Sequence, residues 1–326
     1  MRRRGRTRAR LQVYAALIAA AAVPQAARAG DAFDLTVPPA APAPQQTADT
    51  AATPAPPVET GGIDAYFAEW SQRVAYARAT QPSWSSPVVT TTGLLEQRVR
   101  FDVDQQNGRG GQQTTVYDGG KGLDLIVSDT NEIQVAAAPY DVRTTPNGKN
   151  QYAGFGDWPF LRVEQRLASS PASGGNYVLT GWVSFQAPAG IEQITANTWE
   201  FTPTLAFGKG FGDFDVQGTV GLVVPASYVD VVGHQLQGNI AFQYHVLRVL
   251  WPEVELNWTH YIDGARGGRN VLYVTPGLVV GRIALTDTLK LTLGVAYQTA
   301  VTRIYATKPA TPSYQNALLV TSRLNF

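Results

Sequence analysis

The chain has 326 residues, of which 44% are hydrophobic and only 16% charged, and it contains no cysteine. Soluble domains usually carry roughly 25% charged residues, so much of this surface is expected to face something other than water. Disulfide scaffolds and thiolate metal sites are excluded. Seven arginines precede position 30, and the remaining 19 basic residues stand against 25 acidic ones, a net charge of −6 that disfavours nucleic-acid binding.

Residues 1–29 are typical of a cleaved export signal peptide. Six arginines within residues 1–10 precede the apolar stretch 11–23, and Ala27-Arg28-Ala29 has the small-x-small pattern that signal peptidase reads. The apolar stretch is too short for a spanning helix, which needs about 20 residues. Because no later segment is long and apolar enough either, we expect an exported chain without a transmembrane helix.

Two segments separate the signal from the main domain. Residues 30–60 are rich in proline, alanine and threonine and poor in large apolar side chains, which predicts a disordered linker. In residues 61–91, the aromatic and apolar positions of 63–79 have helical spacing, and Pro82 disfavours helix at the residue before it. We expect a short helix there, with a role as a plug or cap or as a periplasmic segment.

From residue 92 to 326 the apolar period changes to two. Val99, Phe101 and Val103 alternate with charged Arg100 and Asp102, and only a strand puts such sets on opposite faces. The same alternation continues to the C-terminus. It predicts about twelve strands, at 92–106, 112–127, 132–140, 157–168, 176–186, 197–208, 213–224, 234–248, 253–262, 270–283, 288–302 and 316–326. Gly119 and Gly120 could divide the second of them, so the count is uncertain by two.

Strand and connection lengths separate a soluble sandwich from a membrane barrel. Several predicted strands reach about 10 to 14 residues, near the 9 to 11 that cross a bilayer at a tilt. Connections alternate between short and long, as in membrane barrels. The short ones are 128–131, 169–175, 208–212, 249–252 and 284–287, and the long ones include 141–156, 187–196 and 303–315. The predicted fold is therefore all-β, a transmembrane antiparallel up-and-down β-barrel in the bacterial outer membrane, with both chain ends on the periplasmic side.

Several short motifs point to one family. Gly154-Phe155-Gly156-Asp157 recurs as residues 210–213, and further motifs are 81–87 (QPSWSSP), 95–98 (LEQR), 202–205 (TPTL) and 323–326 (RLNF). With these motifs, residues 80–326 resemble the outer-membrane transporter family named for the MetA pathway of phenol degradation. The resemblance implies an outer-membrane barrel that admits small molecules, for some members aromatic hydrocarbons or their products. It supplies no functional residues.

Polar side chains on the inner face are the candidate site. Charge facing lipid at mid-bilayer costs roughly 2–4 kcal/mol for Arg or Lys, so these residues should line the lumen. They form either a cross-strand salt-bridge lattice that fills a closed barrel or a selectivity lining for a solute. The predicted lumen-lining residues are Glu96, Arg98, Arg100, Asp102, Arg162, Glu164, Arg166, Glu200, Gln217, Gln243, Glu253, Glu255, Asn257 and Arg323.

No pattern in the sequence indicates catalysis, a metal or a cofactor. His234, His245 and His260 lack the partners of a hydrolase site, and no metal-binding spacing occurs. We therefore expect a passive channel for small molecules, with hydrophobic or aromatic ones as the candidate solutes. Its expected partners are outer-membrane lipid, the solute and the assembly machinery, for which Phe326 resembles the C-terminal signal of outer-membrane barrels. The alternatives are a non-conducting structural or adhesive barrel and, less favoured, an outer-membrane lipid hydrolase.

Overall fold

The computed structural model describes residues 62–119, 121–145, 148, 150–305 and 313–326, all within one compact unit, Glu59–Phe326. The predicted signal peptide (1–29) and linker (30–60) lie outside the described residues. Helix α2 (Ile63–Ala79) has the predicted bounds. No helix in the described part of the chain is both long and apolar enough to span a membrane.

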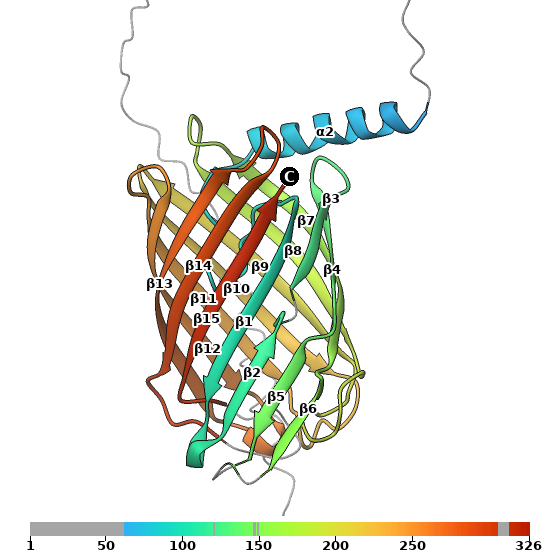
Figure 1. Ribbon diagram of the computed structural model, residues 1–326, viewed down its shortest axis with the longest axis vertical. Coiled ribbons are helices and arrows are strands. Elements are labelled where there is room, and N and C mark those ends of the chain that lie inside the picture. The colour runs from blue at the N-terminus through green and yellow to red at the C-terminus, as the bar shows by residue number, and fades with distance from the viewer. Residues whose placement is uncertain (1–61, 120, 146–147, 149, 306–312) are drawn as a thin grey trace, which may run out of the picture. The chain divides into compact units, whose positions relative to one another are not determined.

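Antiparallel strands make up most of the described chain (Figure 1). In chain order they are β1 (Arg98–Asn107), β2 (Gln113–Tyr117), β3 (Gly122–Ile126), β4 (Asn131–Ala136), β5 (Tyr140–Thr144), β6 (Gln151–Phe155), β7 (Trp158–Ser170), β8 (Tyr177–Ala187), β9 (Glu200–Phe211), β10 (Phe214–Pro225), β11 (Gln235–Tyr244), β12 (Leu250–Tyr261), β13 (Asn270–Ala284), β14 (Lys290–Ala300) and β15 (Asn316–Asn325). In the described residues, the 3₁₀ turns η1 (Arg109–Gly111) and η3 (Gly264–Arg266) lie in connections.

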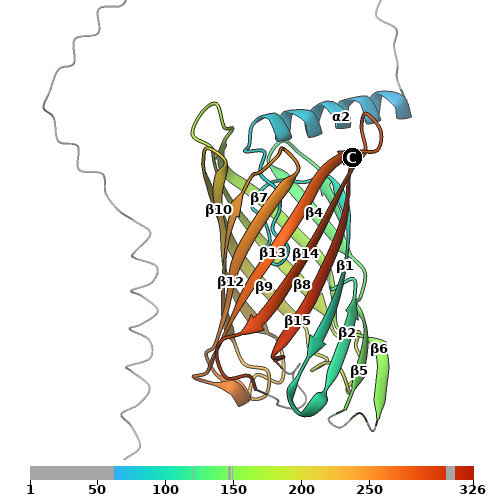
Figure 2. The same cartoon turned by 60° about the vertical axis from the view of Figure 1, so that its left-hand side comes forward.

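The sheet closes on itself, which removes its edges along the seam. From β7 to β15 every strand pairs with its successor in the sequence, and β15 also pairs with β1. In this closing pair Arg98 lies opposite Asn325 and Asn107 opposite Asn316. Figure 2 shows β14, β15 and β1 side by side at the seam. The predicted antiparallel barrel is confirmed.

The fifteen segments make twelve strands of the barrel, as predicted. Three of the twelve strands are interrupted, and each consists of two segments. The first consists of β2 and β3, which both pair with β1. The second consists of β5, which pairs with β2, and β4, which pairs with β3; the third consists of β6, which pairs with β5, and β7, which pairs with β4. Asp118 and Gly119 cause the first break because both have positive φ. Pro139 lies at the second, since proline cannot donate to the ladder. The predicted division near Gly119 is thus a break within one strand, and the count stays at twelve.

The side-chain alternation divides the wall into a polar inside and an apolar outside. On β1, Arg98, Arg100 and Asp102 are buried, whereas Val99 and Phe101 are 45% and 46% exposed. The other strands repeat the pattern, because one face of each meets the lumen. The exposed outer side chains, called the belt below, include Val135, Val163, Leu167, Leu205, Phe207, Val220, Phe242, Val254, Leu293, Val295, Leu318 and Val320.

The two ends of the barrel differ. Helix α2 and the C-terminus lie at one end, called the α2 end, where the connections 127–130, 171–176, 212–213, 245–249 and 285–289 are short (Figure 1). The other end, called the loop end, has longer connections such as 188–199 and 301–315.

Two expectations need correction. The segment 141–156 contains most of the hairpin β5–β6 rather than being only a long loop, and β1 begins at Arg98 rather than at 92.

Candidate functional site

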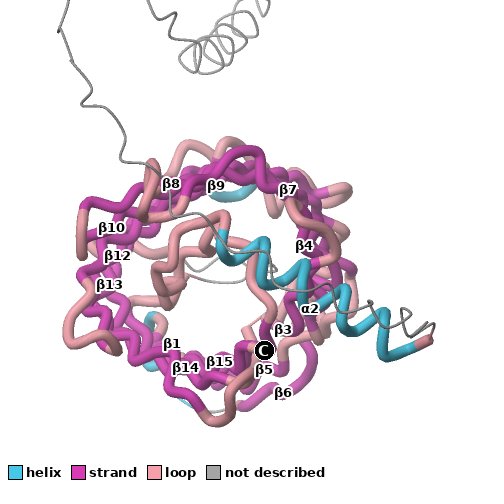
Figure 3. Tube along the Cα trace, turned by 90° about the horizontal axis from the view of Figure 1, so that it is seen from above, coloured by secondary structure: helices cyan, strands magenta, loops and turns pink. Residues whose placement is uncertain are grey.

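A segment of the chain fills the barrel at the α2 end. Residues 81–97, called the plug, follow α2, pass into the lumen and return to the start of β1. Figure 3 shows loop segments inside the ring of strands. The two ends of the plug are tied together, because the Gln81 side chain donates to Leu95 O (2.8 Å) and accepts from Leu95 N (3.0 Å).

Two arginines of the wall donate to main-chain carbonyls of the plug. Arg323 on β15 binds Ser86 O and also Pro87 O, the latter at 2.6 Å. Arg100 on β1 binds Val88 O at 2.5 Å. Each of these three carbonyls would otherwise be buried without a donor, so the arginines stabilise the plug where it lies.

Two glutamates on β12 accept from the main chain of the same stretch. Glu253 accepts from Val88 N at 3.0 Å, and Glu255 accepts from Val89 N at 2.8 Å and Thr90 N at 2.5 Å. The plug tip is therefore bound by carboxylates and guanidinium groups from opposite sides of its main chain.

Neutral side chains complete the contact on the next strands. Gln217 on β10 donates to Ser85 O at 2.8 Å and accepts from Thr92 Oγ1 at 2.7 Å. Thr180 on β8 donates to Gly93 O at 2.5 Å. The plug thus contacts the wall around much of the circumference through polar groups.

An apolar contact seals the plug tip on one side. Val88 packs in a buried cluster with Trp251, Val279, Ala296 and Leu319 of the inner wall. Near the α2 end, Trp84 packs against Val178, and a Cβ added at Gly208 would lie 2.5 Å from the Trp84 ring. Glycine at 208 therefore leaves the room that this plug side chain occupies.

An ion-pair lattice lies beside the plug on β1, β3, β4 and β7. Asp124 on β3 binds Arg98 Nε at 2.7 Å, and Arg162 on β7 binds Glu132 on β4 at 3.1 Å and Glu164 at 3.2 Å. Arg98 also pairs with Glu96 of the plug, and Glu132 accepts from the Glu96 main chain. The lattice and the plug are consequently one hydrogen-bonded system.

A second polar network lies toward the loop end. Asn257 on β12 accepts from Gln298 at 2.8 Å and from Thr275 at 2.9 Å, and it donates to Asn239 at 3.0 Å. Tyr314, in the connection before β15, donates its hydroxyl proton to Gln298. Uncharged groups therefore dominate this network, in contrast to the charged side chains around the plug.

The structure brings most predicted site residues together on the inner side of the wall. Glu200 and Glu96 are half-buried, and Glu96 lies in the plug rather than on β1. Arg166 binds Ala77 O at 2.8 Å and fixes the junction between α2 and the plug. The other predicted site residues are all buried: Arg98, Arg100, Asp102, Arg162, Glu164, Arg166, Gln217, Gln243, Glu253, Glu255, Asn257 and Arg323. Their role as a lumen lining for a solute stays a prediction.

The set of lumen-lining residues predicted from the sequence lacks three residues that contact the plug or the lattice: Asp124, Glu132 and Arg282. Asp124 and Glu132 obey the alternation, Asp124 between Leu123 and Leu125, so the period of two could have found them. Arg282 breaks the alternation because it lies in a β-bulge with φ of 60°. Its guanidinium binds Trp84 O at 2.6 Å, so the bulge turns a wall side chain over the plug.

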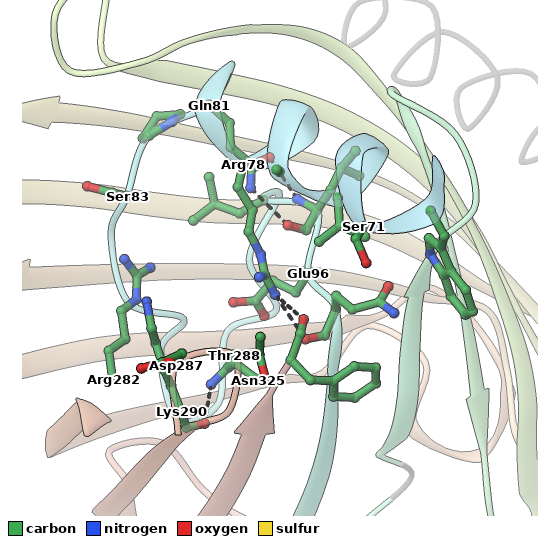
Figure 4. Close-up of a pocket in the computed structure, with 18 of the residues that line it drawn as sticks. Ser71, Arg78, Gln81, Ser83, Glu96, Arg282, Asp287, Thr288, Lys290 and Asn325 are labelled. Atoms are coloured by element: carbon green, nitrogen blue, oxygen red, sulfur yellow. Dashed lines mark hydrogen bonds between the residues drawn. The ribbon is translucent and has the colours of Figure 1, made fainter. Parts of the chain in front are cut away.

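A cavity of about 520 Å³ lies above the plug at the α2 end (Figure 4). Its lining combines apolar residues of α2 and the plug with Arg78, Arg282 and Lys290. Arg78 donates to Phe326 O at 2.7 Å. The pKa of Arg78 is below its usual range because its guanidinium is partly desolvated at the barrel rim and, to a smaller extent, because the Arg282 guanidinium lies nearby.

The histidines have separate environments. His234 pairs with Asp263 at 2.9 Å, His245 stacks on Trp251 with ring centroids 4.4 Å apart, and His260 contacts Asn270 at 3.0 Å. No group of three or more His, Cys, Asp or Glu side chains in the described residues is arranged to hold a metal ion.

Comparison with known proteins gives distant structural likenesses. The chain is similar to the COG4313 outer-membrane channel from Pseudomonas putida F1, with 13% identity and a TM-score of 0.45 over 74% of this chain and 100% of that one. It is also similar to the KdgM porin (11%, 0.37, 70% and 99%) and to the β domain of the Bordetella autotransporter BrkA (14%, 0.41, 71% and 99%). No protein-family model and no curated protein matches. The resemblance to the phenol-pathway family therefore stays a prediction.

Proposed function

We propose that this chain is an outer-membrane channel for the passive passage of small molecules, closed in the conformation described here by the plug. A solute passes either by displacing the plug or after the plug has moved spontaneously. The proposal includes no catalytic step and no cofactor. The side chains that bind the plug would then line the open path.

The outer surface supports the membrane location. Side chains such as Phe101, Leu205 and Val295 are 45–47% exposed on the outside of the barrel, while charged groups lie inside. An apolar outer band on a closed sheet suits a bilayer, in which every backbone polar group must be satisfied within the protein.

The observation that carries the channel proposal is the filling of the lumen by a chain segment. A barrel of about eight strands can be filled by its own side chains, and the diameter grows with strand number. This barrel has twelve strands, and the plug occupies the extra space. Its main chain is bound by wall side chains such as Glu255 and Arg323, so those bonds can break and form again without unfolding the wall.

The proposed solutes are small hydrophobic or aromatic molecules. This choice of solute class rests on the family resemblance alone. Around the plug tip the wall offers an apolar patch with Trp251 and Val279 next to the polar side chains of Glu253 and Arg323. Such a mixed surface suits a small molecule with an apolar body and one polar group.

A non-conducting structural or adhesive barrel is the second candidate. The ion pairs of Arg98 and Arg162 with buried carboxylates favour it, because such a lattice also fills space in a closed barrel. Under that alternative the plug is a permanent part of the core. The outer-membrane lipid hydrolase is the least favoured candidate.

Planar-bilayer conductance separates the two candidates. In one variant, residues 84–92 are replaced by a glycine and serine sequence of equal length, which removes the plug side chains but keeps the connection. The channel proposal predicts that wild type opens rarely and that the variant conducts continuously. If folded wild type never conducts, whether or not the variant does, the structural barrel is the better account.

A further inference from the structure

Helix α2 has one continuous apolar face. Ile63, Phe67, Trp70, Val74 and Ala77 follow one another at intervals of four, three, four and three residues, the spacing that places side chains on one side of a helix. Within this face Val74 and Ala77 are buried, whereas Ile63 and Phe67 are 75% and 52% exposed. The same face is therefore buried in its C-terminal half and mostly exposed in its N-terminal half, where Phe67 lies at the edge of the cavity at the α2 end.

The apolar face passes from exposed to buried where α2 crosses the barrel wall. Val74 and Ala77 pack with Leu95 and Ile126. The Trp70 indole donates to Ile126 O at 3.0 Å, and Arg73 donates to Val127 O at 3.1 Å. Ile126 is the last residue of β3 and Val127 follows it at the α2 end, so these bonds fix the helix on the rim. Figures 1 and 3 show that the N-terminal part of α2 continues past the wall.

The projecting half is rich in aromatic side chains. Tyr66 is 57% exposed and contacts Phe67 edge-on, with ring centroids 5.6 Å apart, and Phe67 stacks on Trp70 at 6.1 Å. Over residues 63–72 the opposite side of the helix carries small or polar residues, among them Ala68 and Gln72, and Tyr76 follows on that side nearer the barrel. The projecting half is therefore amphipathic, with aromatic rings on the side that faces the rim.

The belt is the surface of the barrel next to the projecting half of α2. Val127, which follows β3, and Val135 on the outer side of β4 are 42% and 45% exposed. We propose that Ile63, Tyr66 and Phe67 insert into the phospholipid leaflet at the α2 end of the barrel, an inference that rests on the proposed membrane location. Aromatic side chains favour the membrane interface, and an amphipathic helix lies in that plane with its apolar face down.

Lipid contact would also fix the entry of the plug. Thr80 and Gln81 follow the helix directly, and Arg166 binds both of their side chains, at 2.9 and 3.0 Å. A helix fixed on the rim by lipid therefore limits how far the first residues of the plug can move away from the barrel.

Single cysteines allow a direct test, because the chain has none of its own. Ile63→Cys and Phe67→Cys probe the apolar face, and Ala68→Cys and Gln72→Cys are matched controls on the opposite face. Val163→Cys reports on the belt. Each purified full-length variant is labelled with a nitroxide in phosphatidylethanolamine and phosphatidylglycerol vesicles, and collisions with oxygen and with a water-soluble nickel chelate are compared. We expect a severalfold higher oxygen-to-nickel ratio at 63, 67 and 163 than at 68 and 72.

The possible results are distinguishable. Water-like ratios at 63 and 67 with a lipid-like ratio at 163 would overturn the lipid contact and leave the barrel in the membrane. A water-like ratio at 163 as well would overturn the membrane location itself. Water-like ratios at 63 and 67 in vesicles, with protection only in native membranes, would assign the face to a protein partner and contradict the inference.

Discussion

Wall side chains hold the plug mainly by its main chain. Glu255 accepts from two consecutive amides, of Val89 and Thr90, and Arg323 donates to two consecutive carbonyls, of Ser86 and Pro87. Main-chain groups are present whatever the plug sequence is. The wall residues therefore determine how firmly the plug is held, and substitutions in them should alter opening.

Glu255→Ala should loosen the plug. It removes the acceptor of two buried amides, and hydrogen bonds to a charged group contribute about 1.5–3 kcal/mol each. We expect the open probability in planar bilayers to rise by at least about tenfold, since 1.4 kcal/mol corresponds to a factor of about ten. Glu255→Gln keeps an acceptor oxygen and should have a smaller effect. Equal open probabilities for wild type and Glu255→Ala would show that these bonds do not hold the channel closed.

Asp124→Asn should destabilise the barrel. Asp124 binds Arg98 at 2.7 Å and lies 3.8 Å from Arg162, so its neutralisation leaves two buried guanidinium groups less compensated. Removal of one partner of a buried pair costs about 3–5 kcal/mol. The temperature at which the folded, faster-migrating band disappears on electrophoresis should fall, whereas Glu192→Gln, on an exposed loop residue, should leave it unchanged. An unchanged temperature for Asp124→Asn would mean that the lattice contributes little.

Among the elements, β15 has a special position because it pairs with both β14 and β1. Phe326 follows its last residue, and its amide donates to Gln97 O at 3.1 Å while its carbonyl accepts from Arg78. The end of the closing strand is thus bonded to the plug and to α2. Closure of the barrel and placement of the plug are coupled at this point.

Deletion of Phe326 should lower the amount of assembled barrel. It removes the terminal aromatic side chain that resembles the assembly signal and both main-chain bonds described above. Quantification of the heat-modifiable band in outer-membrane fractions measures the effect, with Phe326→Tyr as the matched control that keeps an aromatic ring. Wild-type amounts of assembled barrel after the deletion would show that the resemblance is accidental.

The strands were predictable from the sequence, and a plug or cap was one expectation for residues 61–91, but the residues that enter the lumen and their contacts with the wall were not predictable. Alternation such as Arg98, Val99, Arg100 and Phe101 is a local property, because successive residues of a strand face opposite sides. Leu95 continues the same period but is buried in the plug, since only the closed ring creates a lumen for it. The partners of Arg98 and Arg162 depend on the register between strands distant in sequence, which no single segment shows.

At the scale of the whole molecule, the wall and the plug differ in how they are held. The wall is a closed ladder of main-chain hydrogen bonds from β1 to β15. Apart from the main-chain bond between Gln97 O and the Phe326 amide, the plug depends largely on side-chain bonds such as those of Glu253 and Arg100. Under the proposed function we expect the two to separate, with the wall intact, at a much smaller cost than unfolding.

A reversible covalent lock tests most directly whether passage requires the plug to move. A Cβ built on Gly93 of the plug would lie 3.2 Å from Ala206 Cβ on β9, close to the roughly 3.5–4.5 Å of disulfides. Gly93→Cys with Ala206→Cys should therefore form a disulfide, and each single variant is a control. We predict that solute flux into protein-containing liposomes is abolished when the pair is oxidised and returns to the level of the single variants on reduction. Flux that is equal in the oxidised and reduced states would contradict a channel closed by its plug.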